Sequence, residues 1–179
     1  QIRESVKAAA QARIKKLTTA PMAPRVEPKN TADVIMPLQK GFVTATTEQL
    51  IAIGASTGGT QALRDVLALM PETAPPVVIV QHMPADFTKT FAEHLDEISP
   101  MNVRESVGGE TLKQGDCYVA PGSHHMLIKR TGGNYYTELV EGQLVNRHRP
   151  SVDVLFRSVA RFAGQNAVGC LMTGMGSDG

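Results

Sequence analysis

Ile51-Ala-Ile-Gly-Ala-Ser-Thr-Gly-Gly59 is the segment of the chain with the clearest structural pattern. Its apolar start is typical of a buried strand, and its glycines form a tight turn into a helix that begins near Thr60. From Gln49 onward, short apolar runs alternate with amphipathic segments. This alternation predicts an α/β fold, a doubly wound and mainly parallel sheet of the Rossmann-like type.

The expected elements follow from periodicity. Strands are expected at residues 50–54, 76–81 and 167–173, and helices at residues 61–70, 88–98 and 151–162. Ser151 follows Pro150 and is a good N-cap for the last helix. Residues 103–145 differ, because Gly and Asn turns separate β-rich segments there. We expect residues 126–130 and 135–140 to form an antiparallel hairpin attached to the parallel sheet.

The glycine-rich turn after the first strand fits two kinds of chemistry. Backbone N–H groups at the start of a helix can bind a phosphate. Alternatively, Gly54-Ala-Ser56-Thr-Gly58 matches the Gly-x-Ser-x-Gly nucleophile elbow, in which a serine oxygen is held above the strand end. The glycine spacing does not match the dinucleotide fingerprint G-x-G-x-x-G. A turn that merely joins a strand to a helix remains the plain structural alternative.

A serine nucleophile needs a base, and that base needs an acceptor that fixes its tautomer. His82 directly follows the apolar run 77–81, so it lies at the carboxyl end of a strand as Ser56 does. Asp178 stands on the flexible turn after the run 167–173. Open parallel sheets form their sites along that edge. Three residues of the required types are therefore expected together.

The other histidines have less specific interpretations. His94 lies inside an amphipathic helix and is expected at the surface, and His148, between two arginines, is expected in a solvated basic loop. His124 and His125 begin a strand and could line a cleft. The chain order Ser, His, Asp differs from the order Ser, acid, His of α/β-hydrolases, so the fold need not be theirs.

Composition sets the class of protein. The chain has 179 residues, 42% of them hydrophobic and 20% charged, with a formal net charge of +1, which excludes a wholly disordered or collagen-like chain. It shows no signal peptide and no apolar run of membrane-spanning length, so we expect a cytoplasmic protein. Cys117 and Cys170 lack metal-binding spacing, and we expect both to be buried, inert thiols.

The first 48 residues differ from the rest. Residues 1–17 carry five basic side chains and one acidic side chain, and their apolar residues recur at helical spacing, which predicts a short basic helix. Residues 18–48 hold four of the 11 prolines. We therefore expect an interdomain linker over 1–48 and a catalytic domain over 49–179, in a fragment cut at both ends.

Five motifs in order carry a resemblance to a known family. They are residues 53–59, residues 81–84 with Phe87-Thr88, residues 120–122 with His125-Met126, residues 149–153 and residues 173–179. Together they resemble the catalytic domain of the bacterial chemotaxis methylesterase CheB, from about Gln49 to the last residue.

The resemblance implies hydrolysis of glutamate methyl esters, and deamidation of glutamines, on methyl-accepting chemotaxis receptors. It implies Ser56 as nucleophile, His82 as general base and acid, and Asp178 as orienter of the imidazole, with the amides near Thr57 and Met175 as candidate oxyanion donors. No metal or cofactor is implied, and no nucleic acid. The receptors, a receiver domain ahead of this one and its histidine kinase are the implied partners, so contact with a membrane comes only through receptors.

The resemblance also implies that the family domain continues past Gly179. We therefore expect this chain alone to be poorly stable and weakly active. Two alternatives of other classes stay open: a nucleotide-binding module that uses residues 54–59, and a non-catalytic interaction domain that docks through residues 1–17.

Overall fold

The computed structural model describes residues 2–11, 28–38 and 48–179. The remainder of the expected basic helix and of the expected linker lies outside these ranges. The elements in chain order are α1 (Ile2–Gln11), η1 (Ala32–Val34), β1 (Leu50–Ala55), α2 (Gly59–Leu67), β2 (Val77–Gln81), α3 (Ala85–Asp96), β3 (Asn102–Glu105), β4 (Asp116–Val119), β5 (His125–Thr131), β6 (Asn134–Val140), α4 (Val152–Phe162), η2 (Gly164–Asn166) and β7 (Ala167–Leu171). Among the described residues, no helix has the length and apolar character to cross a membrane.

The centre of the fold is a parallel sheet. Within the described residues it has five strands in the order β3-β4-β2-β1-β7, and every neighbouring pair runs parallel. Since parallel neighbours need crossover connections, this order places helices on both faces. The predicted doubly wound α/β fold is confirmed.

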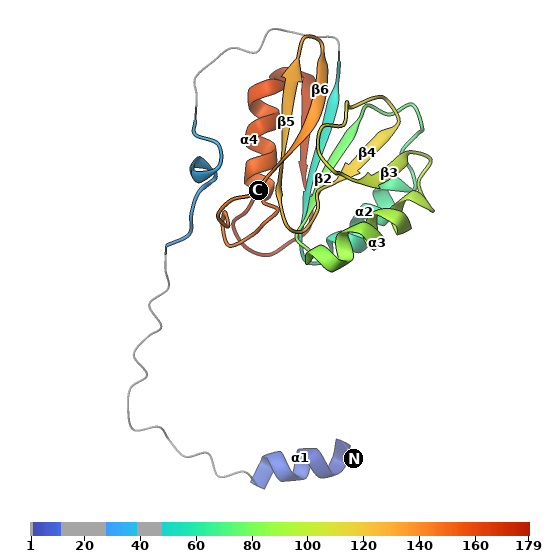
Figure 1. Cartoon of the computed structure of the whole chain (residues 1–179). Helices are drawn as coiled ribbons and strands as arrows, with labels where there is room; N and C mark the ends of the chain where they lie inside the picture. Colours follow the sequence, from blue (N-terminus) through green and yellow to red (C-terminus); the bar gives the residue numbers. More distant parts are fainter. Residues whose placement is uncertain (1, 12–27, 39–47) are drawn as a thin grey trace.

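Side chains alternate between the two faces of the sheet and build two core clusters. Ile53, Ile79 and Val119 pack on one side with Leu63 of α2 and Leu95 of α3. The opposite side is covered by α4 and the β5–β6 hairpin, whose apolar residues meet side chains from β1, β2 and β4. Figure 1 shows α2 and α3 on one side of the sheet and α4 on the other. Both faces of the central strands β1 and β2 are buried, so these two strands are almost continuous apolar runs.

The antiparallel hairpin is confirmed, but its attachment differs from expectation. β5 pairs with β6 in a two-stranded sheet of its own, which packs on α4 instead of extending the parallel sheet. The Ile128 amide of β5 donates to Oγ of Ser158 in α4 at 2.8 Å. Sequence reasoning missed β3 and β4, because they have four residues each and β3 carries mostly polar side chains.

Residues 28–38 lie against the folded body. Ala32 and Met36 are buried in a cluster with Leu127, Val145 and Val154. The Arg157 guanidinium of α4 donates to the Asp33 carboxylate at 2.5 Å and to the Met36 carbonyl at 3.0 Å. The assignment of residues 1–48 as an interdomain linker remains a prediction, and this part of it is packed on the domain.

β7 is an edge strand with exposed side chains. Cys117 is buried as expected, whereas Cys170 of β7 is exposed, so the expectation of two buried thiols is wrong for Cys170. The physical reason is its position: among the described residues β7 pairs with β1 and with no second strand, and Val168 and Leu171 are also exposed. An apolar run alone cannot distinguish a central strand from an edge strand.

The close approach of α4 to β1 gives a testable prediction. A Cβ atom at Gly54 would lie 2.3 Å from Cγ1 of Val152, so Gly54→Ala should destabilise the fold by about 1–3 kcal/mol, the usual cost of overpacking a core. The matched control is Gly169→Ala in β7, where nothing lies within 4 Å of the added methyl. Urea unfolding measures both, and equal losses for the two variants would contradict this account of the packing.

Candidate active site

Ser56 and His82 follow directly after two neighbouring strands. Ala55 of β1 is the register partner of Gln81 of β2, so the next residue of each strand leaves the sheet at the same edge. The His82 amide donates to the Ala55 carbonyl at 3.0 Å, and the Ser56 amide donates to the Thr173 carbonyl at 3.0 Å. The backbones of both predicted catalytic residues are thereby fixed to adjoining strand ends.

The turn that carries Ser56 requires its glycines. Gly58 has φ +78° and is the N-cap of α2, and the Gly59 amide donates to the Ser56 carbonyl at 2.8 Å. The buried Gln81 side chain donates from Nε2 to the same carbonyl at 2.9 Å. A Cβ at Gly59 would lie 2.1 Å from Gln81 Oε1, so only glycine fits there. The turn is packed and hydrogen-bonded, as a precisely positioned serine needs.

Asp178 is the most enclosed group of the site, with its side chain 1% exposed. Its carboxylate accepts five hydrogen bonds. Oδ2 accepts from His82 Nε2 at 2.7 Å and from the Val152 amide at 2.8 Å. Oδ1 accepts from Ser151 Oγ at 2.7 Å, from Asn146 Nδ2 at 3.1 Å and from the Asp153 amide at 3.2 Å. The two amides belong to the start of α4, where the helix dipole favours a negative charge. Ser151 also caps α4, as predicted, by accepting from the Val154 amide.

These contacts decide the charge of Asp178. Burial of the carboxyl group raises its pKa, but the hydrogen bonds from His82, Ser151 and Asn146 lower the pKa by more, so it lies well below the ordinary aspartate value. Asp178 is therefore an anion at neutral pH, and it can only accept hydrogen bonds.

The ionised Asp178 fixes the tautomer of His82. Because the carboxylate has no hydrogen to give, the 2.7 Å bond requires that His82 Nε2 carries the proton. His82 Nδ1 then has a free lone pair; it is buried and makes no hydrogen bond within the described part of the chain. The Nδ1 atoms of His125 and His148 are also buried without a hydrogen bond within the described residues, so this state alone does not mark a base. The ionised Asp178 on Nε2 is what makes His82 Nδ1 a candidate proton acceptor.

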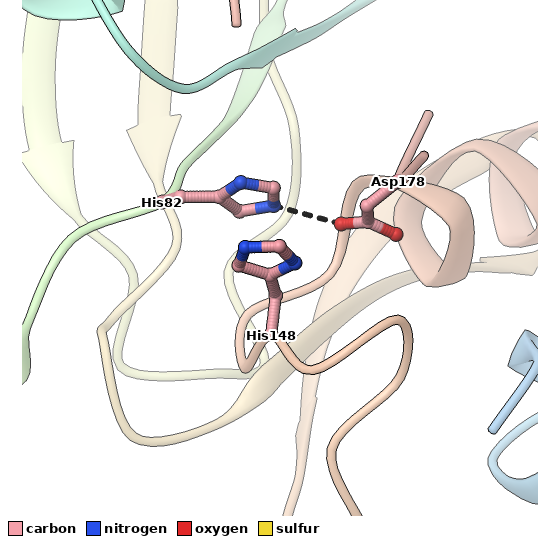
Figure 2. Close-up of side chains that lie close together, drawn as sticks. All are labelled: His82, His148 and Asp178. Atoms are coloured by element: carbon pink, nitrogen blue, oxygen red, sulfur yellow. Dashed lines mark hydrogen bonds and ion pairs between the residues drawn. The ribbon is translucent and has the colours of Figure 1, made fainter. Parts of the chain in front are cut away.

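His148 also belongs to the site, which corrects its placement in a solvated loop. Its ring stacks on the ring of His82 with centroids 3.7 Å apart and an interplanar angle of 3°. Figure 2 shows the two rings face to face beside Asp178. The flanking arginines suggested exposure, and they are exposed, but the turn directs the histidine inward. Asn146 and His148 had no sequence signal of their own; only the resemblance of residues 149–153 pointed to this region.

A small pocket of about 100 Å³ opens beside the cluster. Ser56, His82 and Asp178 all line it, as does Met175, a residue that is 81% exposed. Thr57 is not among its lining residues, and its carbonyl accepts a hydrogen bond from Thr173 Oγ1 at 3.1 Å. The sequence-predicted triad thus shares one pocket, while the oxyanion roles of the Thr57 and Met175 amides stay predictions.

The remaining histidines lie elsewhere in the described chain. His94 is exposed on α3, as expected. His125 is fully buried, and its Nε2 interacts with the Gln143 carbonyl at 2.9 Å, so it supports the fold of the neighbouring loop and does not line the pocket.

His82, His148 and Asp178 could in principle hold a metal ion, since one ligand atom of each lies within 4.8 Å of the others. Two imidazoles and a carboxylate are a common zinc ligand set. Here, however, Asp178 already accepts five protein hydrogen bonds, and the two rings lie parallel, so their nitrogen lone pairs do not converge on one point. The arrangement favours proton transfer over cation binding.

Comparison with known proteins identifies the family. The CheB methylesterase family model matches residues 51–179. The chain belongs to the CheB methylesterase family. The crystal structure of the Thermotoga maritima CheB methylesterase catalytic domain is similar, with a TM-score of 0.72 and 36% sequence identity over 75% of this chain and 71% of that one.

Curated relatives of this CheB-family chain are named for two reactions. A protein-glutamate methylesterase/protein-glutamine glutaminase of Geobacter metallireducens is 52% identical over all of this chain and 50% of its own length. A protein of the same description from Rhodospirillum rubrum is 53% identical over 97% of this chain and 50% of its own length. The chain therefore spans about half the length of these relatives.

The low pKa of Asp178 gives a prediction of pH dependence. A carboxyl whose pKa is lowered by folding contributes stability that is complete above its unfolded pKa of about 3.9 and is lost as the pH falls toward its folded pKa. We expect Asp178→Asn to destabilise the fold by about 3 kcal/mol at pH 7, since it removes one partner of a buried pair.

Urea unfolding at several pH values tests the sign. The difference in the free energy of unfolding between the original chain and Asp178→Asn should be at least as large at pH 5 as at pH 7. This difference should become smaller below pH 4 as the carboxylate is protonated. A gap that is unchanged between pH 5 and pH 3 would show that Asp178 does not have a lowered pKa.

Proposed function

We propose that the chain is the catalytic part of a serine hydrolase that demethylates glutamate methyl esters, and deamidates glutamines, on chemotaxis receptors. The observation that carries the proposal is the hydrogen bond from His82 to a buried, ionised Asp178 in the pocket that Ser56 also lines. The names of the relatives support the reaction type. This proposal assigns Ser56, His82 and Asp178 as the catalytic triad.

The reaction follows from the protonation states. His82 Nδ1 takes the proton of Ser56 Oγ as this oxygen attacks the γ-carbonyl carbon of the modified glutamate. The imidazolium, held by Asp178, returns the proton to the leaving group, which departs as methanol from an ester or as ammonia from an amide. Water then loses a proton to His82 Nδ1 and attacks the acyl-enzyme, releasing the glutamate side chain and restoring Ser56. Neighbouring backbone amides, those near Thr57 and Met175 in our proposal, stabilise the oxyanion of each step.

The partners extend this proposal to the complete protein. The substrate is the methyl-accepting receptor, and a receiver domain phosphorylated by its histidine kinase is proposed to precede residues 1–48, which serve as the interdomain linker. The catalytic domain begins near residue 49, and the reaction takes place in the cytoplasm. The relatives' twofold greater length supports a further domain in those proteins.

The two alternative functions make different demands on the same residues. A nucleotide-binding module would use the amides of residues 54–59, and the His82–Asp178 pair would have no role in binding. An interaction domain that docks through its first helix would be indifferent to all three triad residues. Equilibrium dialysis with a dinucleotide and partner binding after removal of residues 1–17 distinguish these functions from hydrolysis.

Removal of the nucleophile tests the proposed function. In the complete protein, Ser56→Ala should reduce methanol release from methylated receptor by about 10⁴-fold or more, as nucleophile removal does in other serine hydrolases. Ser123→Ala is the matched control, because Ser123 is exposed on a turn and does not line the pocket. Methanol release that persists in Ser56→Ala would exclude a serine mechanism.

A further inference from the structure

His148 reaches His82 on a tight turn. Val145 and His148 pair through two backbone hydrogen bonds, of 3.0 and 2.8 Å, so Asn146 and Arg147 are the two central residues of a hairpin turn. Both have positive φ, 48° and 71°, which is the pattern of a type I′ turn. Non-glycine residues adopt this conformation at a cost, so the surrounding contacts must hold it.

Contacts on both sides hold this turn. The Asn146 amide donates to the Asn30 carbonyl at 2.9 Å, and Asn30 Nδ2 donates back to the Leu144 carbonyl at 3.1 Å. On the inner side, Asn146 Nδ2 donates to Asp153 at 2.5 Å and to Asp178 at 3.1 Å. The turn that carries His148 is therefore hydrogen-bonded to the same carboxylate as His82.

The stacked geometry constrains the ring plane of His82. The Nε2 bond to Asp178 fixes one ring atom, but rotation about an axis through that bond would still change the direction of the Nδ1 lone pair. A parallel ring at 3.7 Å blocks this rotation on one face. The hydrogen bond to Asp178 and the stacked ring of His148 together fix the ring plane of His82, and with it the direction of the Nδ1 lone pair.

The charge of His148 suits this arrangement. Burial and the neighbouring His82 both lower the pKa of His148, in that order of size, and Lys29 also lowers it, against an opposing effect of Asp178. A neutral aromatic face can stack on an imidazolium, whereas a second cation would repel it. When His82 holds the serine proton, a neutral His148 therefore favours the charged state.

We propose that His148 is a positioning residue, which holds the imidazole plane of His82 and stabilises its protonated form by ring stacking. This inference rests on the proposed esterase function, because it assigns His82 as the base. It requires the aromatic face of residue 148 and none of its nitrogen atoms, which separates it from a role in proton transfer or substrate binding.

Two substitutions in the complete protein separate these requirements. His148→Phe keeps a flat, uncharged ring, and His148→Leu has similar bulk without an aromatic face. We expect His148→Leu to lower kcat for methanol release about 10- to 100-fold, as misplacement of a catalytic group does, with KM changed less than about twofold. His148→Phe should retain kcat within about threefold of the original protein.

The outcomes are distinct. A His148→Leu variant with the original kcat, or a His148→Phe variant as slow as His148→Leu, would overturn the positioning role, because the first makes the ring dispensable and the second makes its nitrogens essential. Thermal melts of both variants check folding, and His148→Asn replaces His148→Leu in the same comparison if the latter fails to fold. If the original protein itself releases no methanol, the proposed function fails instead.

Discussion

The carboxylate of Asp178 is the interaction on which the site depends. A buried anion is costly unless donors surround it, and five hydrogen bonds from three parts of the chain do so here. His82 comes from the end of β2, Asn146 from a tight turn, and the other donors from the start of α4. Satisfying one charge therefore brings together segments that lie 96 and 32 residues from it in sequence.

The parallel sheet provides the second constraint. Register pairs Ala55 with Gln81 and Gly54 with Leu171, and the Met172 amide continues the ladder to the Gly54 carbonyl at 2.8 Å. The Ser56 turn, His82 and the Asp178 turn therefore leave adjacent strands at one edge. Fixed strand ends hold the backbones, and the hydrogen bond to Asp178 orients the His82 ring. The proposed proton transfer would thus depend on the same contacts that stabilise this edge of the fold.

Sequence patterns predicted the helices and strands whose apolar residues recur with a regular period. The apolar runs predicted β1, β2 and β7, and helical spacing predicted α2, α3 and α4. The position of Ser56, His82 and Asp178 after strand ends predicted that they lie together, and all three line one pocket. β3 and β4 were not predicted, because the sequences of short, partly polar strands show no clear period. The place of His148 in the site was not predicted, because it depends on a turn whose two central residues, Asn146 and Arg147, have positive φ without being glycine.

Ser56 is proposed to be a nucleophile that the His82–Asp178 pair activates. The most direct test of this role is mass spectrometry of the complete protein after reaction with an organophosphonate that labels activated serines. The account predicts a single adduct on Ser56 that forms much more slowly in His82→Gln. Labelling of another serine, or labelling of Ser56 at an unchanged rate in His82→Gln, would contradict it.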